Sequence, residues 1–436
     1  MGPIFDTGLL PRLRGRGDPV ADGVVAGLLA DAPAADPEDT LVHLLRCLRD
    51  LDENADVAAW IGAVETPPPW LDVTLMARGQ EFFADWSLDI VTSLFCASLP
   101  FAYAAAQGVE VLERASLLAD PRTVARRIAE TGQMLLDVGT PRALAPGARG
   151  YRTARTVRLL HAVIRARLTL DPGAPGDPAH AHAVWDTAEL GVPVNQEDLL
   201  GTLLSFTTVV FRAFENMGIP PAKVEREAYL ALWGAIGALL GIEYSEAVLR
   251  PDKAEELTDV IAKRLHAGSK AGVHLMEVLM DEMELSMPWG MRKLPRTLVR
   301  HLGGDQVADM LGVEESAWWG ALLPVLAALN RLTRRVPAGR AILQAPSRLL
   351  GRSVIRMWVD RNILGEGSTH VHIDPSNLAR LGIRRGPGEP TVGLRGRLRG
   401  VRRRARLRQR RRLASAAQAA TTGPAESTAA GRSRAW

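Results

Sequence analysis

The chain has 436 residues, of which 47% are hydrophobic and 23% charged, proportions that fit an ordinary globular protein and exclude an intrinsically disordered one. The formal net charge is +4 at pH 7, yet residues 394–412 contain eleven Arg and no acidic residue. Removing those eleven charges leaves −7 on the remainder, so a mildly acidic body carries a strongly basic tail.

Helical periodicity runs through almost the whole chain, and long alternating strand patterns are missing from it. Proline- and glycine-rich stretches separate the periodic segments, as at 66–70, 144–150 and 171–178. The predicted fold class is all-α. We predict one helical domain over residues 1–385 and a disordered Arg-rich tail over residues 386–436, because no apolar face persists in the tail. Helices are predicted over residues 19–30, 38–51, 54–64, 71–76, 79–107, 108–116, 121–138, 152–170, 180–189, 195–216, 222–241, 252–266, 269–282, 292–300, 304–312, 315–334 and 339–360.

The N-terminal residues and the two cysteines bear on cellular location. Asp18 and Asp22 interrupt the small apolar residues that an export signal would keep continuous, so we expect a cytoplasmic protein. Cys47 and Cys96 are the only cysteines and neither lies in a CxxC motif. This excludes a disulfide framework and cysteine-ligated zinc or iron–sulfur sites.

Residues 90–109 form the longest uncharged stretch, twenty residues that are long enough for a transmembrane helix. Small and polar residues dominate the stretch, Pro100 interrupts it, and its flanks are acidic on both sides. We therefore favour a helix buried inside the helical domain over a membrane span.

Two helix starts stand out further along the chain. Asp120 and Pro121 supply a cap and a first-turn proline, and Asn195 precedes the acidic first turn of "NQEDLL". Asn195 and Asp198 match a variant of the capping box, so helix initiation by itself accounts for this motif.

Motifs of the common enzyme classes do not occur: the sequence has no phosphate-binding loop, serine elbow or HExxH. The pairs "HAH" at 180–182 and "HVH" at 370–372 are candidate chelating pairs, because residues i and i+2 share a face of a strand. Neither has a third ligand nearby in sequence, which favours surface histidines over a metal site.

His161 is the most informative single residue, because it lies in an apolar helix face. Val157, Leu160, Ile164 and Leu168 fall on the same side of the predicted helix. A lone histidine on such a face is most often a core residue bonded to a backbone carbonyl. The same surroundings also suit an axial ligand of haem iron, which needs one imidazole and an apolar pocket.

The preceding helix carries a polar pair, Arg127 and Thr131, one turn apart and in line with Leu135 and Val138. A guanidinium and a hydroxyl above an apolar stripe fit a distal oxygen site. A surface ion pair of Arg127 and a bond from Thr131 to its own helix explain the pair equally well.

Five segments in this order resemble the rubber oxygenase (latex-clearing protein) family and the related MpaB-type oxygenases. The likeness spans roughly residues 15–330 and implies a globin-like all-helical core. It also implies one non-covalently bound haem b and the use of O2 to cleave carbon–carbon double bonds of polyisoprene. The segments are "RRIAETGQMLLDV", "TARTVRLLHAVIR", "GVPVNQEDLLGTLLSFTTVVFRAFENMGI", "EREAYLALWGAIGALLGI" and "HLGGDQVADMLGV".

The resemblance also implies roles for particular residues. His161 matches the axial histidine, and Arg127 and Thr131 match an upstream arginine and threonine, 34 and 30 residues before it. Glu113, or Glu110 beside it, is the nearest counterpart of the catalytic glutamate. Where some relatives carry a lysine that caps the iron, this chain has Glu130, which favours an open distal site.

The predicted function is therefore that of a haem b-dependent oxygenase acting with O2 on an apolar alkene, isoprenoid or lipid. Two alternatives remain: a haem protein of the same fold without enzymatic activity, and a cofactor-free helical protein acting through its basic tail. The tail predicts weak contact with anionic membranes. Nucleic acid is the less favoured partner, because no aromatic residue interleaves the arginines.

Overall fold

The computed structural model describes residues 8–30, 68–115, 121–145, 147–169, 185–314, 317–351, 353 and 355–356. These residues form helices, with a single isolated β-bridge between Ala105 and His266, and the all-α prediction is confirmed. The chain divides into units 1–384 and 385–436, and the second unit lies outside the described residues. So do the predicted helices over 38–51 and 54–64, both histidine pairs and the predicted disordered tail.

Two short helices begin the described chain, α1 (Leu9–Arg14) and α2 (Pro19–Ala30), and the first of them was missed in the sequence. Asp18 caps α2, because its carboxylate accepts a hydrogen bond from the Ala21 amide at 3.2 Å. The Asp22 carboxylate in turn accepts one from the Asp18 amide at 3.1 Å. The two aspartates that argued against an export signal thus begin a helix.

The single helix expected over 79–107 is wrong, because the chain bends by 85° between α5 (Val73–Asp85) and the segment that follows. That segment comprises α6 (Ser87–Ser93), the π-helical turn η2 (Leu94–Ser98) and α7 (Leu99–Tyr103). The bend falls at Trp86, whose ring packs edge-on against Phe214 at a centroid distance of 5.8 Å. Tertiary packing of an aromatic side chain, rather than Pro or Gly, marks this break.

The uncharged stretch lies inside the protein, where Ile90, Cys96 and Ala97 are buried. No single helix in the described part of the chain combines the length and the apolar composition needed to cross a bilayer. The bent pair of α5 and Ser87–Tyr103 meets that test by length and composition alone.

The helix expected over 195–216 is also divided, into α13 (Gln196–Ser205) and α14 (Thr208–Asn216). At the break the Thr207 and Thr208 hydroxyls donate to the carbonyls of Leu203 and Leu204 at 3.0 and 2.9 Å. Hydroxyls that bond backward in this way compete with the helical amides for the same carbonyls. The break therefore follows from two adjacent threonines.

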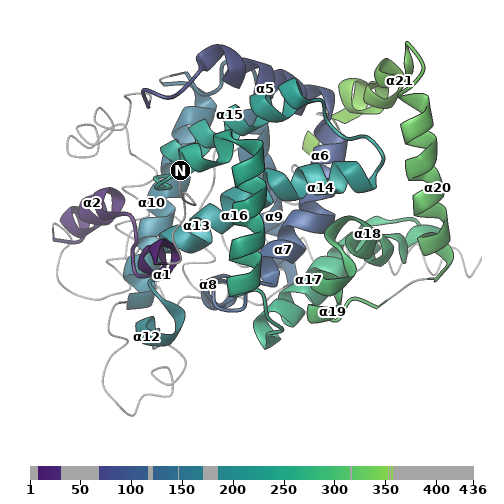
Figure 1. Ribbon diagram of the computed structural model, residues 1–436. Coiled ribbons are helices and arrows are strands. Elements are labelled where there is room, and N and C mark those ends of the chain that lie inside the picture. The colour runs from purple at the N-terminus through teal and green to yellow at the C-terminus, as the bar shows by residue number, and fades with distance from the viewer. Residues whose placement is uncertain are drawn as a thin grey trace, which may run out of the picture. The chain divides into compact units, whose positions relative to one another are not determined.

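Most of the remaining helices follow the predicted segments closely, with the short helices η3 and η4 added (Figure 1). The remaining helices are α8 (Val109–Ala115), α9 (Pro121–Gly139), α10 (Arg149–Thr169), α12 (Thr187–Leu190), α15 (Lys223–Leu239), η3 (Ser245–Leu249), α16 (Pro251–Leu265), α17 (Lys270–Ser286), η4 (Trp289–Met291), α18 (Leu294–Gly303), α19 (Asp305–Met310), α20 (Ala317–Thr333), α21 (Gly339–Pro346) and η5 (Ser347–Gly351). Two do not follow the prediction: α12 covers only four residues where a helix over 180–189 was predicted, and the helix predicted over 339–360 begins as α21 and continues as the π-helical η5.

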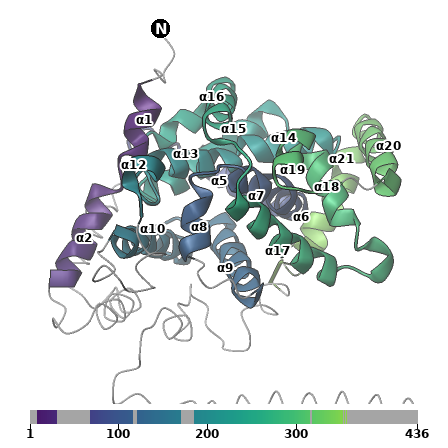
Figure 2. The ribbon, with the colours of Figure 1, turned by 90° about the horizontal axis from the view of Figure 1, so that it is seen from below.

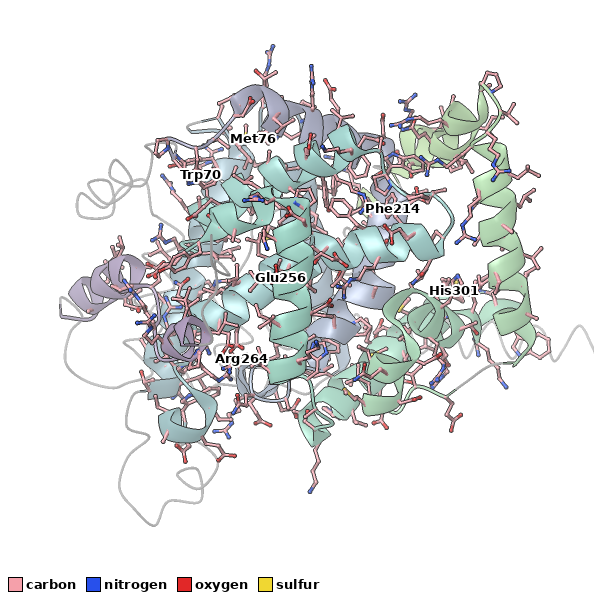
Figure 3. The ribbon with its side chains drawn as sticks, in the orientation of Figure 1. Trp70, Met76, Phe214, Glu256, Arg264 and His301 are labelled. Carbon is pink, nitrogen blue, oxygen red and sulfur yellow. The ribbon has the colours of Figure 1, made fainter. Side chains whose placement is uncertain are left out.

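The main hydrophobic core lies where α15 packs against α5 and α14 (Figure 3, around the labelled Phe214). A Cβ on Gly79 would come within 2.2 Å of the Ala228 carbonyl oxygen, so the α5 and α15 backbones touch there. Phe82 stacks edge-on with Tyr229, at a centroid distance of 5.3 Å, and both rings are buried. A second cluster of buried residues joins α7, α17, α18 and α19.

His266 ends α16 at the bridge to Ala105, with its ring edge-on to Phe101 at a centroid distance of 4.4 Å. Burial lowers the pKa of His266 from 6.5 to about 4, while a hydrogen bond with the Phe101 backbone acts in the opposite direction. The imidazole is therefore neutral in the folded protein at pH 7.

We expect this neutral imidazole to make folding stability depend on pH. Below pH 6.5 the unfolded chain binds a proton that the folded protein refuses down to pH 4, so the free energy of unfolding falls by ~1.4 kcal/mol per pH unit across that window. The free energy of unfolding, measured by urea unfolding of the apoprotein, should differ less between pH 7.5 and pH 5 in His266→Gln than in the wild type. His301→Gln, at a partly exposed ring on α18, serves as the control. An unchanged pH difference in His266→Gln would refute this assignment.

Candidate functional site

The site is built on α10, the helix that carries His161. The residues expected around His161, namely Val157, Leu160, Ile164 and Leu168, are all half-buried, as is His161 itself. They form one apolar stripe along α10 that the rest of the described protein covers only in part.

Three arginines of α10, Arg155, Arg158 and Arg165, are buried, and the sequence did not predict this. Arg158 binds Asp18 through Nε at 2.5 Å and through a terminal nitrogen at 2.9 Å. Arg165 Nε binds Asp22 at 2.7 Å. Both guanidiniums are buried and flank His161, at three residues before and four after. The helix with the candidate ligand is thus fixed to the start of α2 by two ion pairs.

The His161 imidazole is neutral at pH 7. Burial is the main cause that lowers its pKa from 6.5 to about 4; the Arg165 charge adds to the effect and the Asp18 charge opposes it. Although the residue as a whole is half-buried, Nδ1 is fully buried and has no hydrogen-bond partner among the described residues. The carbonyl partner expected of a structural histidine is not found for Nδ1 in this part of the chain. A neutral, unpartnered nitrogen suits a metal ligand.

The apolar stripe joins two hydrophobic clusters. Val157 packs against the main core, whereas Ile164 and Leu168 pack against a small cluster of Val111 and Trp185 with Leu190. Because Val111 belongs to α8, this cluster brings α8 to the same side of α10 as His161. The stripe therefore has an apolar wall at both ends.

Helix α9 packs against α10, so the structure brings the helix of Arg127 and Thr131 beside that of His161 (Figure 2). The Thr153 hydroxyl of α10 donates to the Asp137 carboxylate of α9 at 2.9 Å. Thr131 is exposed, and the face that carries it becomes buried one turn later, at Leu135. The side chain of Arg127 lies outside the described residues, so its predicted role stays a prediction.

Of the two candidate bases on α8, Glu113 is the one that forms no ion pair with a described residue. Its side chain is half-buried, two residues after Val111 of the small cluster. Glu110 is engaged by Arg114, whose Nε lies 3.3 Å from the carboxylate. The geometry therefore favours Glu113 over Glu110 as a free carboxylate near α10.

The "NQED" segment does more than begin a helix. The Asn195 side-chain oxygen accepts a hydrogen bond from the Asp198 backbone amide at 2.9 Å, as the capping motif predicts. Glu197, however, is fully buried between Arg14 and Arg264, at 3.5 and 2.8 Å. A glutamate in the first turn of a helix does not indicate that two distant arginines bind it. The sequence therefore did not predict this ion-pair contact between α1, α13 and α16.

Metal sites of other kinds find no support among the described residues, since no group of three His, Cys, Asp or Glu side chains gathers there. A haem iron needs only one imidazole from the protein together with an apolar pocket. His161 offers one imidazole, and the half-buried residues of its stripe place apolar side chains beside it.

The comparisons with known proteins agree with the resemblance seen in the sequence. Residues 90–336 match the family described as ER-bound oxygenase mpaB/B′/Rubber oxygenase, catalytic domain. The rubber oxygenase of Streptomyces sp. (strain K30) is 26% identical over 238 residues, which is 52% of this chain and 55% of that protein. The chain thus spans about half the length of this curated relative.

A solved structure of the latex clearing protein LCP in its closed state shares the fold. Its TM-score is 0.60 with 21% sequence identity, over 80% of this chain and 91% of that one. The family match extends over more than half of the chain and includes His161, Arg127, Thr131 and Glu113. The protein belongs to the family of MpaB-type and rubber oxygenase catalytic domains.

Proposed function

We propose that the protein is a haem b-dependent oxygenase that acts with O2 on an apolar alkene, an isoprenoid or lipid. The observation that carries the proposal is the His161 imidazole, which is neutral and leaves a buried Nδ1 without a partner. The name of the related rubber oxygenase supports the same reaction class.

The residues of α10 fit such a cofactor. His161 would hold the iron, and Val157, Leu160, Ile164 and Leu168 would contact the apolar macrocycle, since each leaves part of its surface uncovered. A neutral imidazole needs to release no proton before it ligates a metal at pH 7. When bound, haem b supplies the oxygen chemistry, and the protein supplies binding and orientation.

Three further side chains would act on the substrate side. Arg127 and Thr131 lie one turn apart on α9, and we propose that they orient an oxygen atom by donating hydrogen bonds. Glu113 on α8 would take a proton from the allylic carbon of the alkene as a general base.

The proposal is tested on the purified full-length protein. A Soret band in the absorption spectrum and O2 consumption that depends on added squalene are the expected results. Haem without squalene-dependent O2 consumption would favour a haem protein without oxygenase activity on this substrate class. Failure to bind haem, even after reconstitution with hemin, would contradict the proposal outright and leave a cofactor-free helical protein.

A further inference from the structure

The last described helices, α20, α21 and η5 within residues 317–351, form what we call the C-terminal arm. In Figures 1 and 2, α20 lies at the edge of the described helices, and it packs against α18 and α21. One face of α20 holds it in place: Ala327 is buried and Asn330 donates to the Met217 carbonyl at 2.9 Å. Arg331 on the same face donates to the Glu215 carbonyl at 3.2 Å.

The end of the arm is fixed by polar contacts as well. The Ser347 hydroxyl donates to the Asp89 carboxylate of α6 at 2.9 Å. Arg348 makes a bidentate pair with Asp85, through contacts of 2.8 and 2.6 Å. Arg340 of α21 also pairs with Glu225 of α15. Hydrogen bonds and two ion pairs thus carry much of the attachment of the arm to the body.

The outward face of the arm is aliphatic. Val325, Leu329 and Leu332 are 61%, 56% and 58% exposed and follow one another at helical spacing, opposite Ala327. The arm has further exposed aliphatic side chains on its other two helices, Ile342 on α21 and Leu349, which is 77% exposed, on η5. Single exposed apolar residues are ordinary, but a contiguous set marks an interaction surface.

The positive charge of the arm indicates which kind of partner its aliphatic face binds. Residues 317–351 contain five Arg and no acidic residue. Arg331 and Arg334 donate to backbone carbonyls, contacts that leave their positive charge unneutralised. Residues 394–412 add eleven more Arg to the same end of the chain.

We propose that the C-terminal arm docks on an anionic lipid bilayer, with its aliphatic face inserted at the boundary between headgroups and acyl chains. Exposed aliphatic side chains bordered by arginines are what such an interface binds. Arg340 and Arg348 of the arm are paired with Glu225 and Asp85. A second copy of the chain would still set Arg331, Arg334 and Arg335 against the same three arginines in a twofold interface, and like charges juxtaposed there oppose association.

The test uses full-length protein and sedimentation with two kinds of vesicle, pure phosphatidylcholine and a 7:3 mixture with phosphatidylglycerol. We expect binding to the mixed vesicles and much weaker binding to the neutral ones. Val325→Gln with Leu329→Gln should weaken binding to the mixed vesicles by about tenfold or more, because two aliphatic side chains no longer leave water on binding. The control pair Val20→Gln with Val260→Gln alters exposed valines of α2 and α16 and should bind as the wild type does.

Several results would overturn the proposal. One is unchanged binding by the Val325→Gln, Leu329→Gln protein at unchanged helicity and Tm, which would assign any binding to the Arg-rich tail. Another is an equal loss in the control pair. A wild-type dimer that ignores mixed vesicles and becomes monomeric in the Val325→Gln, Leu329→Gln protein would instead assign the face to a second copy. None of these measurements depends on haem or on oxygenase activity.

Discussion

Replacing His161 with alanine is expected to abolish stoichiometric haem binding while the helices remain folded. The His161 imidazole would be the iron ligand that α10 supplies, and alanine offers no donor atom in its place. Nδ1 has no hydrogen-bond partner among the described residues, so the substitution removes few interactions from the apoprotein. Haem titration followed by the Soret absorbance, with circular dichroism as the measure of folding, gives the result.

His266 provides the matched control for this experiment. Burial lowers its pKa to about 4 as well, and its Nε2 is likewise buried without a partner among the described residues. The two imidazoles therefore share the chemistry that a ligand needs, but only His161 lies in the half-buried stripe on α10. His266→Gln should keep a normal Soret band. Loss of haem in His266→Gln with retention in His161→Ala would move the ligand to the end of α16.

The fold class was predictable because helical periodicity is a local property of the sequence. The two wrong helices show where local information ends. The bend at Trp86 depends on packing against Phe214, a residue 128 positions away. The break at Thr207 had a local cause, hydroxyls that bond backward, but threonine occurs within intact helices too, and so its sequence signal is weak.

The candidate site was predictable in part for the same reason. His161 and its apolar stripe follow from spacing along one helix, and the resemblance then gave the stripe a chemical meaning. The burial of Arg158 and Arg165 did not follow, because their partners are aspartates about 140 residues earlier in the chain. Arginines on a helix are ordinarily solvated, and only the folded chain shows that these are not.

Asp18→Asn is expected to destabilise the protein by ~3–5 kcal/mol, because it removes the negative charge that the buried Arg158 guanidinium binds through two contacts. Asparagine is as good a helix cap as aspartate, so the start of α2 is retained and the effect reports the ion pair. A Cβ on Gly241 would come within 2.3 Å of the Asp18 carboxylate, which shows how closely the backbone encloses the pair. Urea unfolding at pH 7 measures the loss.

The double variant Asp18→Asn, Arg158→Met should be more stable than Asp18→Asn alone, since it removes both charges of the buried pair and not one of them. Glu243→Gln, which breaks the largely exposed pair with Arg16 at 2.8 Å, should cost no more than about 1 kcal/mol. A cost for Asp18→Asn as small as that of Glu243→Gln would mean that the buried pair contributes no more than a surface one.

The outcome bears on which part of the chain forms the site. The family match begins at residue 90, whereas Asp18 and Asp22 precede it. Both aspartates hold arginines within four residues of His161, on the helix that carries the candidate ligand. If the Asp18 pair contributes as expected, a protein trimmed to residues 90–336 would lose both anchors of α10. Its haem affinity would then fall although every residue assigned to the haem and the substrate is still present.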